Sequence, residues 1–279
     1  MTTQQRWWRF RQFLNWYASA KTIYDIHSPG AFELVSALEQ LPIEWKEGRE
    51  ILNFRKRLRR DRHLLTKDNE GPKAIIEENY HNSTVGRFSR KTQLPLSAYR
   101  KMFRLAKYRN AKHILELGTG SGLAHYVLRK ARPEAHITSV DADPYLTELA
   151  RTNIGRHERK SSFICDSFTG FWQDEAARSM PWDLIVLDGD HRGVTLLNNF
   201  HQIRKNNLEY GFKPSVFIGD IRWSSGMLTA WEELMDQYEG IALDYFDFGI
   251  LHPGGETGPY LKASLIPYRY KFWRAGFFA

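Results

Sequence analysis

From residue 111 onward, short apolar runs alternate with longer stretches that are competent to form helices. The runs cover His113–Leu117, His136–Val140, Ser162–Cys165, Asp183–Leu187, Ser215–Ile218 and Ile241–Phe248. Strands that alternate with helices pair in parallel and are covered on both faces, so the pattern predicts an α/β fold with a mostly parallel sheet. Open sheets of this kind bind ligands at the carboxyl ends of their strands. The residues that follow each run are therefore the first candidates for a site.

The N-terminal part of the chain has a different periodicity. Across residues 1 to about 65, apolar residues recur every three or four positions, which predicts helices. Ile51, Phe54 and Leu58 share one face of a segment with a dense basic surface, so we expect an amphipathic, cationic helix there. Turn-forming residues at 68–72 predict a change of direction. We therefore expect a helical module over residues 1–80 and a second domain over 81–279.

Composition restricts the partners and the compartment. The net charge of +8 permits attraction to nucleic acid, anionic lipid or an acidic small substrate, without choosing among them. The single cysteine, Cys165, excludes an internal disulfide and a Cys-only zinc site and favours a reducing compartment, so we expect a cytoplasmic protein. No apolar stretch reaches the length needed to span a bilayer, so we expect no membrane association.

The first apolar run ends in a glycine-rich loop of Gly118, Thr119, Gly120, Ser121 and Gly122. Glycines allow positive φ angles and let a ligand approach the backbone closely. The helix-competent residues that follow would present free backbone N–H groups at their N-terminus. The loop therefore predicts binding of a nucleotide-like cofactor by these five residues.

Two features separate this loop from a dinucleotide-binding fingerprint. Its spacing is G-x-G-x-G rather than G-x-G-x-x-G, and Glu116 stands two residues before the first glycine. A carboxylate repels a pyrophosphate but suits the cationic end of S-adenosylmethionine. We therefore expect S-adenosylmethionine, although the loop by itself also permits an NAD-dependent oxidoreductase.

Acidic residues follow the next three runs as well. Asp141, with Ala142, lies about 20 residues beyond the glycine loop, where a carboxylate can accept two ribose hydroxyls. Asp166, with Ser167, could accept the exocyclic amine of adenine, and Asp188 follows the fourth run. Each acid alone could instead cap a helix or a turn. Together they favour a cofactor site.

Three segments, Ile114–Gly122, Ser139–Asp143 and Asp183–His191, resemble the first, second and fourth motifs of class I S-adenosylmethionine-dependent methyltransferases. The resemblance covers about residues 85–270. It implies a Rossmann-like sheet of seven strands, mostly parallel, with the last strand antiparallel. It also implies that the chain is a transferase with S-adenosylmethionine as its cofactor.

More narrowly, Asp188–His191 and Val216–Trp223 resemble a bacterial group related to the catechol-type O-methyltransferases. In that family an Asp-Asn pair after the fifth strand binds Mg²⁺ together with the fourth-strand aspartate. Asp220 matches the aspartate of the pair, but Ile221 stands in place of the asparagine, so an oxygen ligand is missing. Asp190 could supply it. Mg²⁺ binding is therefore left open.

The same resemblance implies a general base at His191, where the family has a lysine three residues after the fourth-strand aspartate. A histidine can remove a proton near neutral pH, although it could also cap the following helix. We expect Asp188, His191 and Asp220 to deprotonate or position the acceptor. The resemblance thus implies O-methylation of a small-molecule acceptor.

The N-terminal helices leave two interpretations open. Tyr24–Pro29 and Gly86–Lys91 also resemble that bacterial group, so these helices could cover the cofactor and line the acceptor pocket. Alternatively, the cationic segment between Glu50 and Arg62 could bind nucleic acid, as in an RNA methyltransferase, or simply form a solvated surface. Neither the acceptor nor the oligomeric state follows from these residues.

Overall fold

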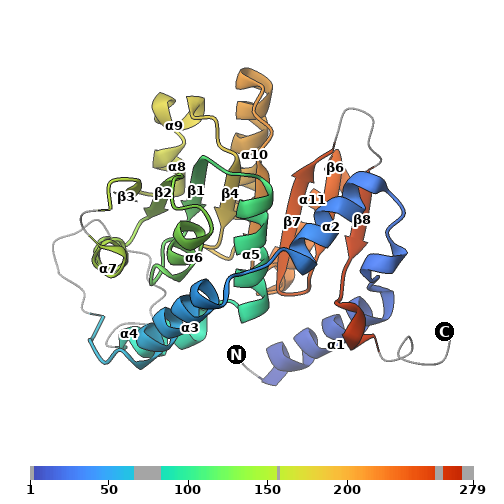
Figure 1. Ribbon diagram of the computed structural model, residues 1–279, viewed down its shortest axis with the longest axis horizontal. Coiled ribbons are helices and arrows are strands. Elements are labelled where there is room, and N and C mark those ends of the chain that lie inside the picture. The colour runs from blue at the N-terminus through green and yellow to red at the C-terminus, as the bar shows by residue number, and fades with distance from the viewer. Residues whose placement is uncertain (1–2, 66–82, 156–157, 255–259, 272–279) are drawn as a thin grey trace.

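The computed structural model describes residues 3–65, 83–155, 158–254 and 260–271 (Figure 1). Its centre is an eight-stranded sheet with the order β3-β2-β1-β4-β5-β7-β6-β8. The strands are β1 (His113–Leu117), β2 (His136–Asp141), β3 (Ser161–Cys165), β4 (Leu184–Leu187), β5 (Ser215–Gly219), β6 (Gly240–Asp244), β7 (Phe248–Pro253) and β8 (Leu261–Ser264). The strands β1 to β5 are all parallel. The predicted α/β fold with a mostly parallel sheet is therefore confirmed.

Helices cover both faces of the sheet. They are α1 (Thr3–Ser19), α2 (Pro29–Gln40), α3 (Trp45–Arg60), α4 (Val85–Thr92), α5 (Leu96–Tyr108), α6 (Leu123–Ala131), α7 (Pro144–Ile154), α8 (Phe168–Phe171), α9 (Glu175–Ser179), α10 (Gly193–Tyr210) and α11 (Ser225–Gln237). Alternate residues of each strand enter different cores: Ile114 packs with α2, α3, α5 and α6, whereas Leu115 packs with α8, α10 and α11. Of the described helices, none is long and apolar enough to cross a membrane.

The strand order reverses direction between β1 and β4, which makes their carboxyl ends the topological switch point of the sheet. The chain runs outward from β1 to β2 and β3 on one side, and from β4 to β5 on the other. The loops after β1 and β4 therefore diverge toward opposite faces and leave a crevice between them.

The far edge of the sheet differs from the expected seven strands with a final antiparallel one. The run Ile241–Phe248 is not a single strand: it contains β6, a tight turn in which Tyr245 N–H donates to Phe248 O, and the first residue of β7. The antiparallel strand is β7, and β8 adds an eighth strand parallel to β6. The four-residue β8 buries only Ala263, so its sequence carries little hydrophobic signal.

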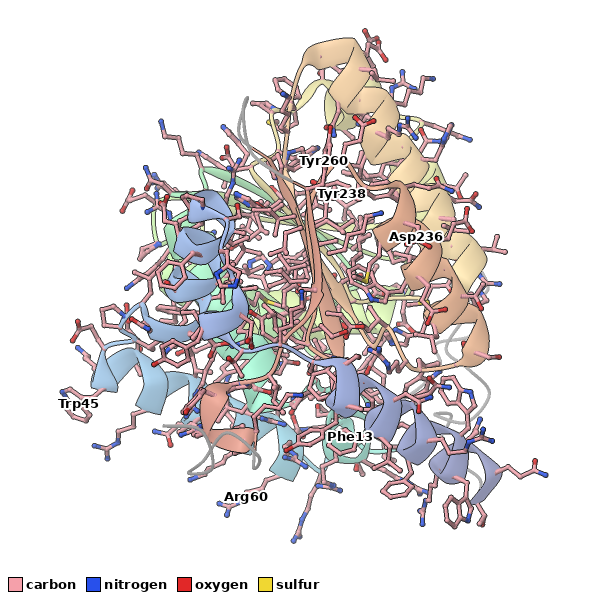
Figure 2. The ribbon with its side chains drawn as sticks, turned by 90° about the vertical axis from the view of Figure 1, so that its right-hand side faces the viewer. Phe13, Trp45, Arg60, Asp236, Tyr238 and Tyr260 are labelled. Atoms are coloured by element: carbon pink, nitrogen blue, oxygen red, sulfur yellow. The ribbon has the colours of Figure 1, made fainter. Side chains whose placement is uncertain are left out.

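The predicted N-terminal helices are present as α1 to α3. In α3 the residues Ile51, Phe54 and Leu58 are buried, which confirms the amphipathic cationic helix. These residues and those of α2 belong to the same hydrophobic cluster as the inner strands, so α2 and α3 share a core with the sheet. Trp45 and Arg60, at the two ends of α3, project outward (Figure 2). The turn expected at 68–72 and the boundary near residue 80 lie outside the described residues, and the domain division stays a prediction.

Helix α1 is fastened to the opposite end of the chain. The guanidinium of Arg9 pairs with Asp247 and donates to the carbonyl oxygen of Arg222 at 3.0 Å. The ring of Phe246 lies 5.3 Å from the Arg9 guanidinium and 5.0 Å from that of Arg222. Arg222 in turn binds both carboxylate oxygens of Asp244, at 2.8 and 2.6 Å. These contacts hold the loop after β5 against the β6–β7 turn and α1.

Candidate functional site

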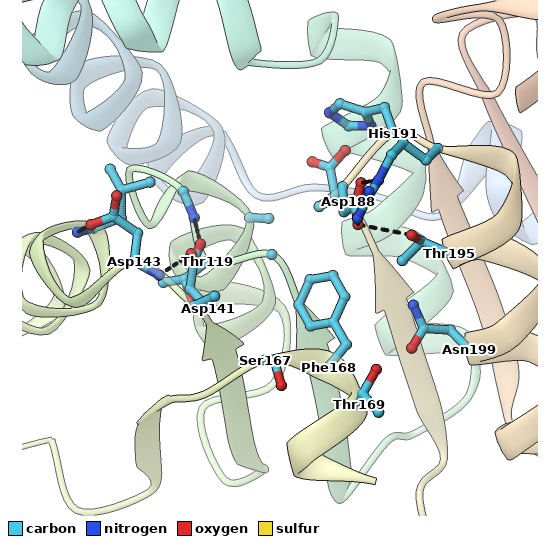
Figure 3. Close-up of a pocket in the computed structure, with 18 of the residues that line it drawn as sticks. Thr119, Asp141, Asp143, Ser167, Phe168, Thr169, Asp188, His191, Thr195 and Asn199 are labelled. Carbon is cyan, nitrogen blue, oxygen red and sulfur yellow. Dashed lines mark hydrogen bonds and ion pairs between the residues drawn. The ribbon is translucent and has the colours of Figure 1, made fainter. Parts of the chain in front are cut away.

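A cavity of about 1090 Å³ opens at the carboxyl ends of the strands, between the loops after β1, β2, β3 and β4 (Figure 3). The predicted site residues that line it are Gly118, Thr119, Gly120, Ser121, Asp141, Ala142, Ser167, Asp188 and His191. The predicted residues outside its lining are Glu116, Gly122, Asp166 and Asp220. In the view of Figure 3, the ring of Phe168 lies between Asp141 and Asp188. Most of the predicted cofactor residues therefore surround one space.

The loop after β1 approaches the loop after β4 through backbone atoms. Gly118 has a φ of 106°, which favours glycine, and a Cβ there would lie 2.5 Å from the amide nitrogen of Gly189. A side chain at position 118 would therefore force these loops apart. The glycine fixes the separation of the two walls of the crevice.

Asp141 connects the end of β2 to the glycine loop. One carboxylate oxygen accepts the Gly120 N–H at 3.1 Å, and the other accepts the Asp143 N–H at 3.0 Å. Burial raises the pKa of Asp141 to about 6, even though these backbone N–H groups favour its charged form. A carboxylate has further lone pairs, so Asp141 can still accept hydroxyl groups from a ligand in the cavity.

Glu116 lies beneath the cavity rather than in it. Its side chain points to the face of the sheet covered by α6, where it accepts from the Ser139 hydroxyl at 2.6 Å and lies 3.2 Å from His125 Nδ1. Ser139 also contacts the Thr119 hydroxyl at 2.6 Å, so the buried glutamate supports the glycine loop from below. It is fully buried, and its placement argues for a supporting role rather than contact with a ligand.

Asp188, directly after β4, has a carboxyl group whose surroundings disfavour the charged form. Its Oδ1 atom is buried and has no hydrogen-bond partner in the part of the chain that the structure describes. Gly219 makes room for it, because a Cβ at that position would lie 2.0 Å from this oxygen. Burial raises the pKa of Asp188 well above its usual value, and the charges of Asp220 and Glu116 raise it further. The surroundings of Asp188 therefore disfavour its charged form.

His191 and Asp220 form a second pair, at the ends of the loops after β4 and β5. His191 Nε2 lies 3.8 Å from Asp220 Oδ2, and its ring lies 5.3 Å from the ring of Trp223. Burial raises the pKa of Asp220, while His191 and Arg9 partly offset that shift. His191 lines the cavity and Asp220 lies behind it. The arrangement suits an imidazole that accepts a proton and a carboxylate that stabilises the resulting charge.

The oxygen donors do not fit a Mg²⁺ site. Asp190, which could have replaced the missing asparagine, is engaged by Arg192 at 2.6 and 2.5 Å and by the Thr195 hydroxyl at 2.8 Å. Ile221 is buried and offers no side-chain oxygen. Within residues 3–65, 83–155, 158–254 and 260–271, no group of three or more His, Cys, Asp or Glu side chains could hold a metal ion. We therefore assign no step to Mg²⁺.

Asp166 and Gly122 have local structural contacts. The Asp166 carboxylate accepts the Ser167 N–H at 2.6 Å and fills the space above Gly170. Ser167 caps α8 by accepting the Gly170 N–H at 3.0 Å. A Cβ on Gly122 would lie 3.2 Å from Ala150, so this glycine permits close packing of the loop on α7. The structure thus leaves contact of Asp166 and Gly122 with a cofactor as a prediction.

One wall of the cavity comes from helices that no strand-end motif points to. Phe88 and Thr92 of α4, Gln93 directly after α4, and Tyr99 of α5 line it. Both amide atoms of Gln93 are buried without a hydrogen-bond partner among the described residues. Burial raises the pKa of Tyr99 well above its usual value, and the charge of Asp188 raises it further. Only the resemblance at Gly86–Lys91 pointed to α4.

Comparison of the sequence with protein-family profiles gave no match. Among curated proteins, the chain is 33% identical over 107 residues to the ribosomal protein L11 methyltransferase of Agrobacterium fabrum, a match that covers 38% of this chain and 32% of that protein. It is 43% identical over 50 residues to the tRNA1(Val) (adenine(37)-N6)-methyltransferase of Flavobacteriaceae bacterium strain 3519-10, covering 18% of this chain and 22% of that protein. The chain thus matches about a third or less of each relative's length.

Among solved structures, the O-methyltransferase TomG from Streptomyces achromogenes in complex with SAM has a TM-score of 0.48 and 14% identity, covering 59% of this chain and 82% of that chain. The O-methyltransferase from Bacillus cereus in complex with SAH has a TM-score of 0.47 and 14% identity, covering 78% and 94%. The curated relatives are methyltransferases, in agreement with the resemblance at the strand-end motifs.

Proposed function

We propose that this protein is an S-adenosylmethionine-dependent methyltransferase that methylates an oxygen atom of a small-molecule acceptor. The observation that carries the proposal is the half-buried Asp141 carboxylate, bonded to the glycine loop at 3.1 Å and lining the cavity at the switch point of the sheet. A carboxylate at the end of β2 can accept ribose hydroxyls, and the G-x-G-x-G spacing of the loop departs from the dinucleotide-binding fingerprint. The partial relatives are methyltransferases, which supports the same reaction class.

The proposed roles of the cavity residues follow from their chemistry. The cofactor supplies an electrophilic methyl group when it is bound. Gly118 to Ser121 offer backbone N–H groups and space for a ligand, Asp141 accepts ribose hydroxyls, and Ser167 with Phe168 borders the place expected for the adenine. The Asp188 carboxyl, with its unpartnered oxygen, would gain stabilisation from a cationic group in the cavity.

The acceptor oxygen would meet His191. Its imidazole lines the cavity and would take the proton of an acceptor hydroxyl, while Asp220 at 3.8 Å stabilises the imidazolium. Tyr99 and Gln93 border the same cavity and would position the acceptor. Holding the hydroxyl in line with the transferred methyl group accounts for most of the acceleration in such a reaction.

Isothermal titration calorimetry with S-adenosylmethionine tests the proposal. We expect binding to the wild-type protein and loss of detectable binding to Asp141→Ala. Asp174→Asn is the matched control, because Asp174 only caps α9 and Asn preserves a cap. A wild-type protein that binds NADH but not S-adenosylmethionine would instead support the oxidoreductase that the glycine loop alone permits.

A second candidate, an RNA methyltransferase, is favoured by one feature. Lys56, Arg57 and Arg60 on α3 are exposed, as are Arg87 and Arg90 on the neighbouring α4, whose other face lines the cavity. Such a basic surface would contact phosphates. Filter binding of a single-stranded RNA from about 50 to 200 mM salt would show a steep loss of affinity if it does. Binding without salt dependence eliminates this candidate.

A further inference from the structure

The charges that line the cavity are segregated along its length. Its acidic residues are Asp141, Asp143, Asp188 and Asp190, all in the loops directly after β2 and β4. Its basic residues beyond the loop after β4 are Arg178, His201 and Lys205, contributed by α9 and α10. Among the described residues that α9 and α10 contribute to the lining, none is Asp or Glu. The cavity therefore has an acidic end at the strands and a basic end between the helices.

One face of α10 forms the path between the two ends. The residues of α10 that line the cavity are Thr195, Asn198, Asn199, His201, Gln202 and Lys205. Thr195 donates to Asp190 at 2.8 Å and marks the acidic end. With a rise of 1.5 Å per residue, Lys205 lies about 15 Å farther along the helix. Figure 3 shows Thr195 and Asn199 facing the cavity from this helix. Polar groups thus line the whole path.

A hydrogen bond between two buried side chains holds the wall of this path in place. The indole nitrogen of Trp172 donates to the side-chain oxygen of Asn199 at 3.0 Å, and both residues are buried. This bond joins the segment after α8 to α10. It holds this part of α10 in place along the path, while at the basic end Arg178 is half-buried and His201 and Lys205 are exposed.

The cations at the basic end differ from the neighbouring Arg192. Asp190 neutralises Arg192 at 2.5 Å. Arg178 and Lys205, in contrast, form no ion pair within the described ranges, and the Nε atom of Arg178 is buried without a hydrogen-bond partner there. The acids Glu175 and Glu209 and the cation Arg178 all act on the pKa of the Tyr210 hydroxyl, and neither acid lines the cavity. An anion that entered the basic end would meet cations that have no ion-pair partner among the described residues.

The size of the cavity leaves room for this anion beside a cofactor. At about 1090 Å³ it exceeds the range of roughly 300 to 1,000 Å³ that is common for the pocket of one small ligand. A methyl donor at Asp141 and the glycine loop would occupy the acidic end. The basic end is therefore free for a different group.

We propose that Arg178, His201 and Lys205 form a subsite for the phosphate or carboxylate group of a small ligand other than the methyl donor. The subsite is defined by the segregation of charge along one cavity and by uncompensated cations at its far end. It does not depend on the proposed methyl transfer, because its residues are separate from those assigned to the donor.

Calorimetry with pyrophosphate and with citrate at low ionic strength tests the proposal and separates the two sources of negative charge. We expect saturable binding of at least one of them to the wild-type protein. Lys205→Met and Arg178→Met should each weaken it about tenfold, as expected when a hydrogen bond to a charged group is lost. Arg204→Met is the matched control, since Arg204 precedes Lys205 on α10 but does not line the cavity.

Three results would overturn the proposal. The first is no binding of either anion, and the second is an equal loss for Lys205→Met and Arg204→Met. The third is competition between S-adenosylhomocysteine and the anion, which would assign the basic end to the donor. A protein that binds RNA through Lys205 but neither small anion would also contradict it. Anion binding without S-adenosylmethionine binding would support the subsite and refute the proposed function alone.

Discussion

The two sides of the crevice differ in how their carboxyl groups are satisfied. On the β1–β2 side, both oxygens of Asp141 accept backbone N–H groups. On the β4–β5 side, Asp188 keeps a buried oxygen without a partner among the described residues, and Asp190 and Asp220 adopt positive φ angles of 46° and 50°. Such strain and unmet hydrogen bonding concentrate at functional sites. The β1–β2 side is thus preformed, whereas the β4–β5 side has polar groups that a ligand would satisfy.

The largest expected effect is a difference between substitutions on the two sides in how strongly they weaken the binding of S-adenosylhomocysteine. Asp141→Asn should weaken binding about 100-fold, because two hydrogen bonds between ligand hydroxyls and a charged group are lost. Asp188→Asn should change the affinity less than about tenfold, since S-adenosylhomocysteine lacks the sulfonium charge of the donor. Calorimetry on both variants measures the difference. Equal losses would show that the two sides do not have separate tasks.

A smaller expected effect is a pH dependence of S-adenosylhomocysteine binding that arises from Asp141 on the β1–β2 side. The pKa of Asp141 is about 6 in the free protein, and hydroxyl groups of a ligand favour the ionised form. Protonation therefore competes with binding, and the affinity for S-adenosylhomocysteine should fall about tenfold from pH 7 to pH 5. Asp141→Asn should remove this dependence. A wild-type affinity that stays constant over this range would contradict the assignment of Asp141.

The smallest effect concerns the stability of the fold and the contribution of Asp188 on the β4–β5 side. Burial raises the pKa of Asp188, so between its unfolded and folded pKa values the fold holds a proton that the unfolded chain releases. The stability contributed by this group is therefore greatest at low pH and is lost as the pH rises. Asp188→Asn cannot ionise, and we expect it to raise the Tm by about 2–4 °C at pH 8.

The same variant should gain less at pH 5, where wild-type Asp188 is more fully protonated. Scanning calorimetry at both pH values makes the comparison, with Asp174→Asn as an exposed control. A destabilised Asp188→Asn at pH 8 would mean that the carboxylate is paired in the free protein and that the contrast between the two sides is wrong.

Sequence patterns predicted the parallel core and most of the strand-end residues because these signals are local. A buried strand is a short apolar run, and the residue after it necessarily lies at the sheet edge. The direction of a side chain is harder to predict from sequence. Glu116 was expected to contact the cofactor, but the alternation of side chains along β1 turns it toward α6. The β6–β7 turn was missed because Tyr245, Phe246 and Asp247 include no glycine or proline.

The wall formed by Gln93 and Tyr99 had no local signal either. Gln93 directly follows α4 and Tyr99 belongs to α5, and the periodicity of a helix does not reveal which of its buried residues face an internal cavity. Their position depends on α4 and α5 packing across the sheet, a contact between segments far apart in the chain. The basic end on α10 has the same origin, since Arg178 and Lys205 meet only through tertiary packing.

Helix α1 contacts residues that are synthesised much later, so it cannot reach its final position until they have been made. Arg9 contacts Arg222 and Asp247, which lie 213 and 238 residues later in the chain. At about 5–20 residues per second, the ribosome reaches these partners roughly 10–50 s after it has made the helix. During that interval Arg9 has no acidic partner at Asp247, and the loop that carries Asp220 does not yet exist. Helix α1 therefore reaches its final place only after Asp247 has been made, and the loop that carries Asp220 gains its contact with Arg9 only then.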